Sequence, residues 1–197
     1  MKKGLTNLLL ILLLVSATHG VSHAATAQSD YGKANKLFSA GKFKDALMLY
    51  QSILSLPSRD IATSVLYTRI GDSHFQLKDY RNALDAYRSA LKDQKFSERP
   101  VTQYWIGFCC IMQGKDTEAI AEFLKIPENY PTSGMWITTA YYWAGRASER
   151  SGRKEQAAEF YRKASGSGKS VQDRYALKKA EAVRSKERVQ GTGSGVQ

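Results

Sequence analysis

Four segments of the chain repeat one pattern of apolar, small and aromatic positions. In each segment an alanine is followed four residues later by an aromatic residue, and a second small residue stands twelve residues before the alanine. The alanines are Ala46, Ala83, Ala119 and Ala157, spaced by 37, 36 and 38 residues. Residues four apart share a helix face, and small residues let two helices approach closely. The pattern therefore predicts four hairpins of two helices each.

The turn inside each hairpin is marked five residues before the alanine. Three hairpins carry glycine there (Gly41, Gly114 and Gly152), and the second carries Lys78. One hairpin cannot bury its apolar face alone, but a stack of hairpins can. We expect repeats over about 28–58, 62–95, 99–131 and 137–165, within a solenoid of residues 25–165.

The repeated residues resemble the tetratricopeptide repeat, and the second unit matches its pattern best. The matching residues there are Tyr67, Ile70, Gly71, Tyr80, Ala83, Tyr87 and Ala90. The resemblance implies an all-α, right-handed superhelix of about four helix-turn-helix repeats, closed by a C-terminal capping helix. Residues 166–188 are expected to form that basic capping helix, and residues 189–197 a disordered tail.

A narrower resemblance rests on two short sequences, YPTS and AYYWAGR, in the fourth unit. They are similar to exported bacterial tetratricopeptide proteins. Relevant cases are the periplasmic cell-division coordinator linked to the Tol-Pal system, outer-membrane assembly lipoproteins and the helical region of soluble lytic transglycosylases. The catalytic domain of the transglycosylases has no counterpart in this sequence.

The first 24 residues have the composition of a secretory signal peptide. Lys2 and Lys3 precede an apolar run over 8–15, and small residues end at Ala24, with Ala27 as a second cleavage position. A transmembrane helix needs about 20 apolar residues, more than this run supplies. The first cysteine is Cys109, so no lipid-anchored cysteine lies at the signal junction. We expect a periplasmic protein that neither spans the membrane nor carries a lipid anchor.

The charge suggests anionic partners. Removal of the signal peptide lowers the formal net charge from +11 to +9, and residues 166–197 hold +4 of it. Basic proteins often bind nucleic acid, but export leaves lipid head groups, cell-wall carboxylates and acidic protein segments as partners. The alternative is a basic helix face that is only solvated.

No residue set indicates catalysis, a metal or a cofactor. His74 is the only histidine after the signal peptide, and the adjacent Cys109 and Cys110 are expected to be buried free thiols. A pair of Cys110 with His74 across neighbouring helices is the alternative, but a nucleophile needs an open pocket. We predict a protein that is not an enzyme.

The resemblance implies that the first helix of each repeat lines a concave groove for a peptide. The predicted groove residues are Tyr31, Asn35, Phe38, Asp72, Phe75, Tyr104, Phe108, Met112, Tyr142, Arg146 and Arg150. Arg146 and Arg150 are expected to receive acidic or C-terminal carboxylate groups, and the aromatic side chains to hold apolar ones. Trp105 and Trp143 belong either to this groove or to the core between repeats.

The resulting hypothesis is a periplasmic adaptor that binds a peptide segment of another envelope protein. Two alternatives remain open. One is a module that stacks cell-wall glycan on the same aromatic side chains. The other is a structural subunit that docks through its convex face or through the basic C-terminal helix, where Lys178, Lys179 and Arg184 lie.

Overall fold

The computed structural model describes residues 26–57, 60–166 and 174–183. The predicted signal peptide, with its cleavage position at Ala24, and the predicted tail of residues 189–197 lie outside this part. Of the segment 166–188 expected to form the capping helix, the structure describes residues 166 and 174–183, and residues 167–173 and 184–188 lie outside the described part.

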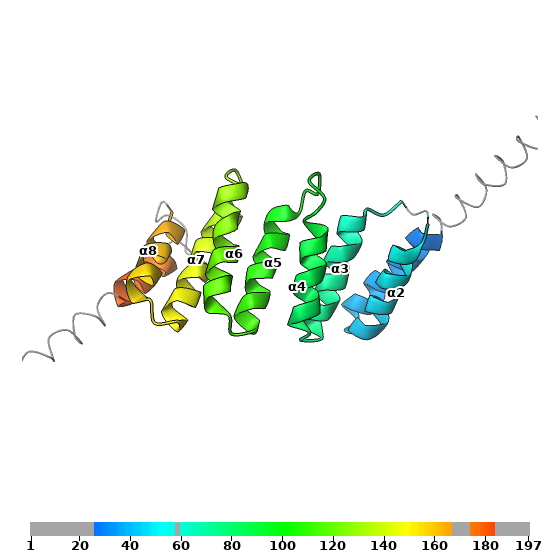
Figure 1. Cartoon of the computed structure of the whole chain (residues 1–197), viewed down its shortest axis with the longest axis horizontal. Helices are drawn as coiled ribbons and strands as arrows, with labels where there is room; N and C mark the ends of the chain where they lie inside the picture. The colour runs from blue at the N-terminus through cyan, green and yellow to red at the C-terminus, as the bar shows by residue number, and fades with distance from the viewer. Residues whose placement is uncertain (1–25, 58–59, 167–173, 184–197) are drawn as a thin grey trace, which may run out of the picture. The chain divides into compact units, whose positions relative to one another are not determined.

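The described residues form helices joined by short turns, with no strand among them. They divide into two compact units, unit 1 with the described residues up to Ala90 and unit 2 with those from Leu91 onward. Unit 1 contains a helix over 26–39, followed by α2 (Phe43–Ser55), α3 (Thr63–Gln76) and α4 (Tyr80–Ala90). Unit 2 contains α5 (Arg99–Met112), α6 (Asp116–Asn129), α7 (Gly134–Arg150), α8 (Lys154–Ala164) and a helix over 174–183. Figure 1 shows α5 to α8 side by side in chain order. The predicted all-α fold of stacked helical hairpins is confirmed.

The small residues predicted to let the helices approach do so by accepting an aromatic ring. A Cβ atom on Gly107 would lie 2.7 Å from the ring of Phe123, and one on Gly145 would lie 2.8 Å from the ring of Tyr161. Both rings are fully buried. Each of these two hairpins is therefore closed by an aromatic ring that packs on the backbone of its first helix.

The turn positions adopt the left-handed conformation that favours glycine. The φ angles are +74° at Gly41, +75° at Gly114 and +77° at Gly152, and Lys78 takes the same conformation with φ +62°. These residues end the first helix of each hairpin, where a left-handed residue lets the chain turn back. Lys78 adopts the conformation despite its Cβ atom.

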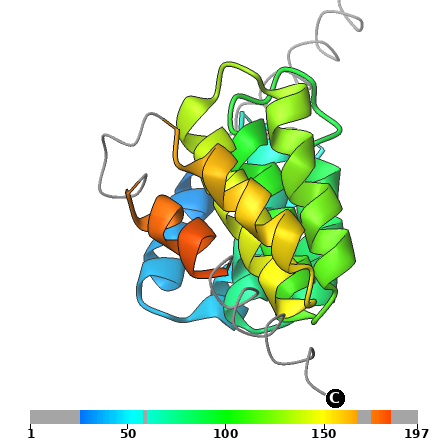
Figure 2. The same cartoon turned by 90° about the vertical axis from the view of Figure 1, so that its left-hand side faces the viewer.

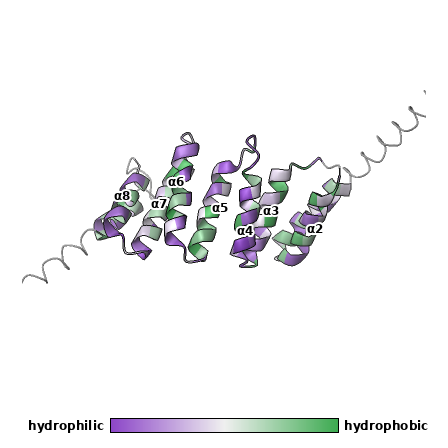
Figure 3. Cartoon of the chain, viewed as in Figure 1, coloured by the Kyte–Doolittle hydropathy of each residue, from purple (hydrophilic) through white to green (hydrophobic). Residues whose placement is uncertain are grey.

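Each unit has its own apolar core. In unit 1, Tyr50, Ile53 and Leu66 are almost fully buried within one cluster. In unit 2, Cys109 and Cys110 are fully buried and form no disulfide, which confirms the prediction of buried thiols. Figure 3 shows hydrophobic and hydrophilic residues on the same helices of unit 2, as expected for amphipathic helices with one buried face.

The helix over 174–183 covers the end of unit 2. It buries Ala176, Ala180 and Val183, which are spaced to share one face. Ala180 and Val183 belong to a cluster with Ala157 and Tyr161 of α8. Figure 2 shows this helix, in orange to red, alongside the helices of the last hairpin. Tyr175 and Leu177, on either side of that face, are exposed.

Candidate functional site

In unit 1, the predicted groove residues of the first helix contact their own hairpin. The Tyr50 hydroxyl donates a 2.7 Å hydrogen bond to Oδ1 of Asn35. The ring centroids of Tyr31 and Tyr50 lie 5.9 Å apart, and those of Phe38 and Phe43 lie 5.2 Å apart. These side chains close the hairpin between the helix over 26–39 and α2.

The second hairpin uses its predicted groove residues in the same way. The Tyr87 hydroxyl donates to Oδ1 of Asp72 over 2.8 Å, and Arg69 pairs with Oδ2 over 3.3 Å. Phe75 lies edge-on to Tyr80, with 5.4 Å between ring centroids. The five predicted site residues of unit 1 therefore have partners inside the fold, which makes them weak candidates for ligand contacts.

Unit 2 brings its predicted aromatic residues together in a continuous array. Tyr104 stacks on Phe108 with centroids 5.7 Å apart, and it also contacts Phe123 at 5.8 Å and Trp136 at 5.5 Å. Burial raises the pKa of Tyr104 to about 12. Tyr104 thus contributes mainly to the packing of α5 on its neighbours.

The array continues from α5 to α7. Phe108 meets Trp143 edge-on with centroids 4.7 Å apart, and Trp143 contacts Tyr142 at 5.8 Å. Trp105 contacts Phe108 at 5.8 Å and, like Trp143, is only half-buried. Each of these two tryptophans therefore packs against its neighbours and also exposes part of its side chain to solvent, so it can belong to the core and to a groove at the same time.

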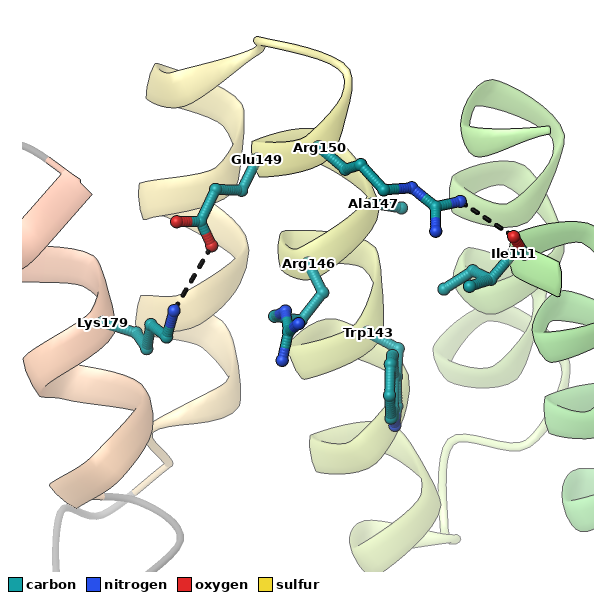
Figure 4. A pocket seen from close by; sticks show the side chains of 7 residues that line it. All are labelled: Ile111, Trp143, Arg146, Ala147, Glu149, Arg150 and Lys179. Atoms are coloured by element: carbon teal, nitrogen blue, oxygen red, sulfur yellow. Dashed lines mark hydrogen bonds and ion pairs between the residues drawn. The ribbon is translucent and has the colours of Figure 1, made fainter. Parts of the chain in front are cut away.

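A pocket of about 250 Å³ lies beside the C-terminal half of α7. Figure 4 shows the side chains around it. The lining residues are Ile111, Trp143, Arg146, Ala147, Glu149, Arg150 and Lys179. They come from α5, α7 and the helix over 174–183, so three segments of unit 2 build the pocket. Met112, the last predicted residue of α5, is 44% exposed and does not line it.

Arg150, a predicted carboxylate receptor, already has partners inside the fold. Its Nε atom donates to Oδ1 of Asp116 over 2.7 Å, and its NH2 group donates to the carbonyl oxygen of Ile111 over 2.9 Å. Asp116 stands at the start of α6, and Ile111 lies in the last turn of α5. Arg150 therefore ties α7 to the preceding hairpin, and its charge is balanced there.

Arg146 is the cation of the pocket that remains available. It is exposed, and its guanidinium carbon lies 5.8 Å from the ring centroid of Trp143. It donates a 3.4 Å hydrogen bond to the Tyr142 hydroxyl, and this bond raises the pKa of Arg146. Among the described residues it forms no ion pair. A cation held on an indole ring without a carboxylate partner is suited to bind an anionic group.

Glu149 and Lys179 form the other side of the pocket. Lys179 Nζ lies 3.6 Å from Oε2 of Glu149, and the same oxygen accepts a 2.8 Å hydrogen bond from the Tyr161 hydroxyl. Burial and this bond to Glu149 raise the pKa of Tyr161. Both charged side chains are about one-third exposed, so their ion pair is open to solvent.

The side chains around the pocket are suited to bind charged and apolar groups. No group of three metal-binding side chains occurs within residues 26–57, 60–166 and 174–183. His74 Nδ1 lies 3.1 Å from Oδ2 of Asp79, and Cys110 is fully buried in α5. Burial raises the pKa of the neighbouring Cys109 thiol to about 12, so that thiol is protonated at neutral pH.

Sequence reasoning missed Lys179 as part of this site, because it was assigned only to a basic helix face. The signal that identifies it is the spacing of Ala176, Ala180 and Val183, which fixes the buried face of that helix. Lys179 lies next to that face, so its ammonium group comes within 3.6 Å of Glu149 in α7.

Family models support the repeat assignment. Two models, both described as tetratricopeptide repeat, match residues 68–134 and 138–166. No curated protein sequence matches the chain. None of the helices in the described part is long and apolar enough to cross a membrane.

Several solved structures share the fold. YrrB, a tetratricopeptide protein whose structure is described as having an unusual peptide-binding site, has a TM-score of 0.61 at 22% identity, covering 80% of this chain and 76% of YrrB. A MamA fragment from Desulfovibrio magneticus RS-1 has a TM-score of 0.61 at 15% identity, covering 86% and 97%. The apo form of RapI has a TM-score of 0.69 at 16% identity, covering 85% and 66%. At these identities the likeness shows the fold alone.

Proposed function

The chain is a tetratricopeptide-repeat protein, and we propose that it is a periplasmic adaptor that binds a peptide segment of another envelope protein. The proposed binding surface is the pocket in unit 2 together with the aromatic array beside it. Tetratricopeptide repeats serve as protein interaction modules, and the solved structure of YrrB is described as peptide-binding. This likeness supports the general role, and the side chains of the pocket support the particular surface.

The observation that carries the proposal is Arg146 on the indole ring of Trp143. An exposed cation and a half-buried aromatic ring, 5.8 Å apart at the lip of a pocket, offer charge recognition and apolar contact at one place. Arginine and tryptophan are the residue types that contribute most to binding energy at protein interfaces. In unit 1, by contrast, the side chains of Asn35 and Asp72 are hydrogen-bonded within their own hairpins.

The proposed location rests on the sequence of residues 1–24, which has the composition of an export signal. Fusing residues 1–27 to alkaline phosphatase tests it, because that enzyme acquires its disulfides and activity only outside the cytoplasm. We expect an active fusion. An inactive fusion that accumulates in the cytoplasm would remove the envelope from the proposal.

Binding is tested by crosslinking in native cells, with the wild-type protein compared with Arg146→Glu. The matched control is Arg162→Glu, a charge reversal at an exposed residue of α8 outside the pocket. The proposal expects a partner that is retained by the wild type and by Arg162→Glu and lost from Arg146→Glu. Identical partners for all three proteins would exclude the pocket and direct attention to the convex face or to the basic C-terminal helix.

A further inference from the structure

We propose that the pocket receives a carboxylate of the bound segment between Arg146 and Lys179, and that this carboxylate takes the place of Glu149 at Lys179. The inference rests on the proposed function and names the chemistry of its ligand. It also makes the C-terminal helix over 174–183 a part of the binding site, because Lys179 belongs to that helix.

The charges around the pocket leave one cation unbalanced. Arg150 is neutralised by Asp116, and Lys179 is paired with Glu149. Arg146 has only the Tyr142 hydroxyl as a hydrogen-bond partner among the described residues. A ligand group with a single negative charge therefore matches the excess charge of the pocket, and a carboxylate has that charge at neutral pH.

The contacts of Glu149 allow a ligand carboxylate to replace it as the partner of Lys179. The contact between Lys179 and Glu149 is long for an ion pair, at 3.6 Å, whereas the hydrogen bond from Tyr161 to Glu149 is short, at 2.8 Å. Glu149 therefore keeps a donor when Lys179 turns to another carboxylate. Arg146 and Lys179 both line the pocket, so a carboxylate inside it faces both cations; Figure 4 shows them among the lining side chains.

The apolar part of the lining determines what accompanies the carboxylate. Ile111, Ala147 and the indole ring of Trp143 contribute to the pocket wall beside the cations. A carboxylate attached to or next to an apolar side chain fits this combination. Both an acidic side chain within a segment and the terminal carboxylate of a chain meet this description.

The test is affinity selection from two synthetic libraries of randomised decapeptides, one with free carboxyl ends and one with amidated ends, using the full mature chain. We expect the enriched peptides to contain a carboxylate beside an apolar residue. Enrichment from the amidated library identifies an acidic side chain as the source, and enrichment from the free-acid library alone identifies the chain end. Peptides without any carboxylate would overturn the inference while leaving peptide binding intact. No enrichment from either library would overturn both.

The role of the C-terminal helix is tested with the enriched peptide and the variant Lys179→Gln. Loss of one partly exposed charge contact is expected to weaken binding by about fivefold. Lys178→Gln, an exposed neighbour outside the pocket, is the matched control and should bind like the wild type. Glu149→Gln should strengthen binding, because it removes the internal competitor for Lys179. Equal affinities for Lys179→Gln and Lys178→Gln would overturn the proposed exchange.

Discussion

The aromatic ring of Tyr87 lies where a side chain at Gly71 would begin. A Cβ atom built on Gly71 is 2.6 Å from Cε1 of this ring. The ring is buried, and its hydroxyl is hydrogen-bonded to Asp72. The ring therefore cannot move aside without losing its buried packing contacts and this hydrogen bond. This contact makes glycine a requirement of the hairpin between α3 and α4.

Gly71→Ala is therefore expected to lower the free energy of unfolding by about 2 kcal/mol, because the added methyl group forces the hairpin apart. Gly32→Ala is the matched control. Gly32 is helical, and a Cβ atom there meets nothing within 4 Å. The control should raise the free energy of unfolding by about 0.5 to 1 kcal/mol through helix propensity. Urea unfolding followed by circular dichroism measures both, and equal effects would refute the packing argument.

Lys78→Gly is expected to stabilise the protein by about 1 kcal/mol. A non-glycine residue in the left-handed region, here at φ +62°, carries a steric cost that glycine avoids. The corresponding Gly152→Ala, at φ +77°, should destabilise by a similar amount. Thermal unfolding of the two variants should shift Tm in opposite directions. A lower Tm for Lys78→Gly would indicate that the lysine side chain compensates for its backbone.

The buried hydroxyl of Tyr50 predicts a loss of stability at high pH. Burial raises the pKa of Tyr50 to about 12, above the value near 10 of an unfolded chain. The folded state thus favours the protonated form. Below pH 10 this preference adds on the order of 2 kcal/mol to the free energy of unfolding. The added stability is lost as the pH rises through 12. Tyr50→Phe lacks the hydrogen bond to Asn35 and should be less stable at neutral pH but less sensitive to alkali. Absorbance of tyrosinate at 295 nm follows the titration, and parallel pH profiles for the two proteins would contradict the assignment.

Substitution of Arg150 is expected to lower the stability of the fold, whereas substitution of Arg146 is not. Arg150→Lys should lower the free energy of unfolding by about 1 kcal/mol, because lysine cannot bond to Asp116 and the Ile111 carbonyl at once. Arg146→Gln should leave stability within about 0.5 kcal/mol of the wild type, because its side chain is exposed. Chemical unfolding measures both. A large loss of stability in Arg146→Gln would show that its contact with Trp143 holds the fold together.

The fold follows from the sequence because its determinants repeat. The alanine, the aromatic residue four positions later and the small residue twelve positions earlier recur in every hairpin. In the three hairpins whose small residue is glycine, the aromatic ring lies against that glycine. Short-range periodicity therefore encodes the contact between Gly145 and Tyr161 as directly as the one between Gly107 and Phe123.

The candidate site was only partly accessible from the sequence, because ion pairs between hairpins depend on residues far apart. Arg146 and Arg150 are alike in the sequence, four residues apart on one helix. Only the packing of α7 against the preceding hairpin shows that Asp116, 34 residues away, neutralises Arg150. Likewise, periodicity identifies Lys179 as lying beside a buried helix face but does not reveal Glu149 as its partner.

The two cysteines of α5 would constrain the folding of the chain in an oxidising compartment. Cys109 and Cys110 are fully buried, so in the folded protein neither sulfur is accessible to an oxidant, and burial also raises the pKa of Cys109 to about 12. In an unfolded chain the same two thiols are open to mixed disulfides. In an oxidising compartment, the time the third hairpin takes to close thus decides how much of the protein escapes covalent misassembly.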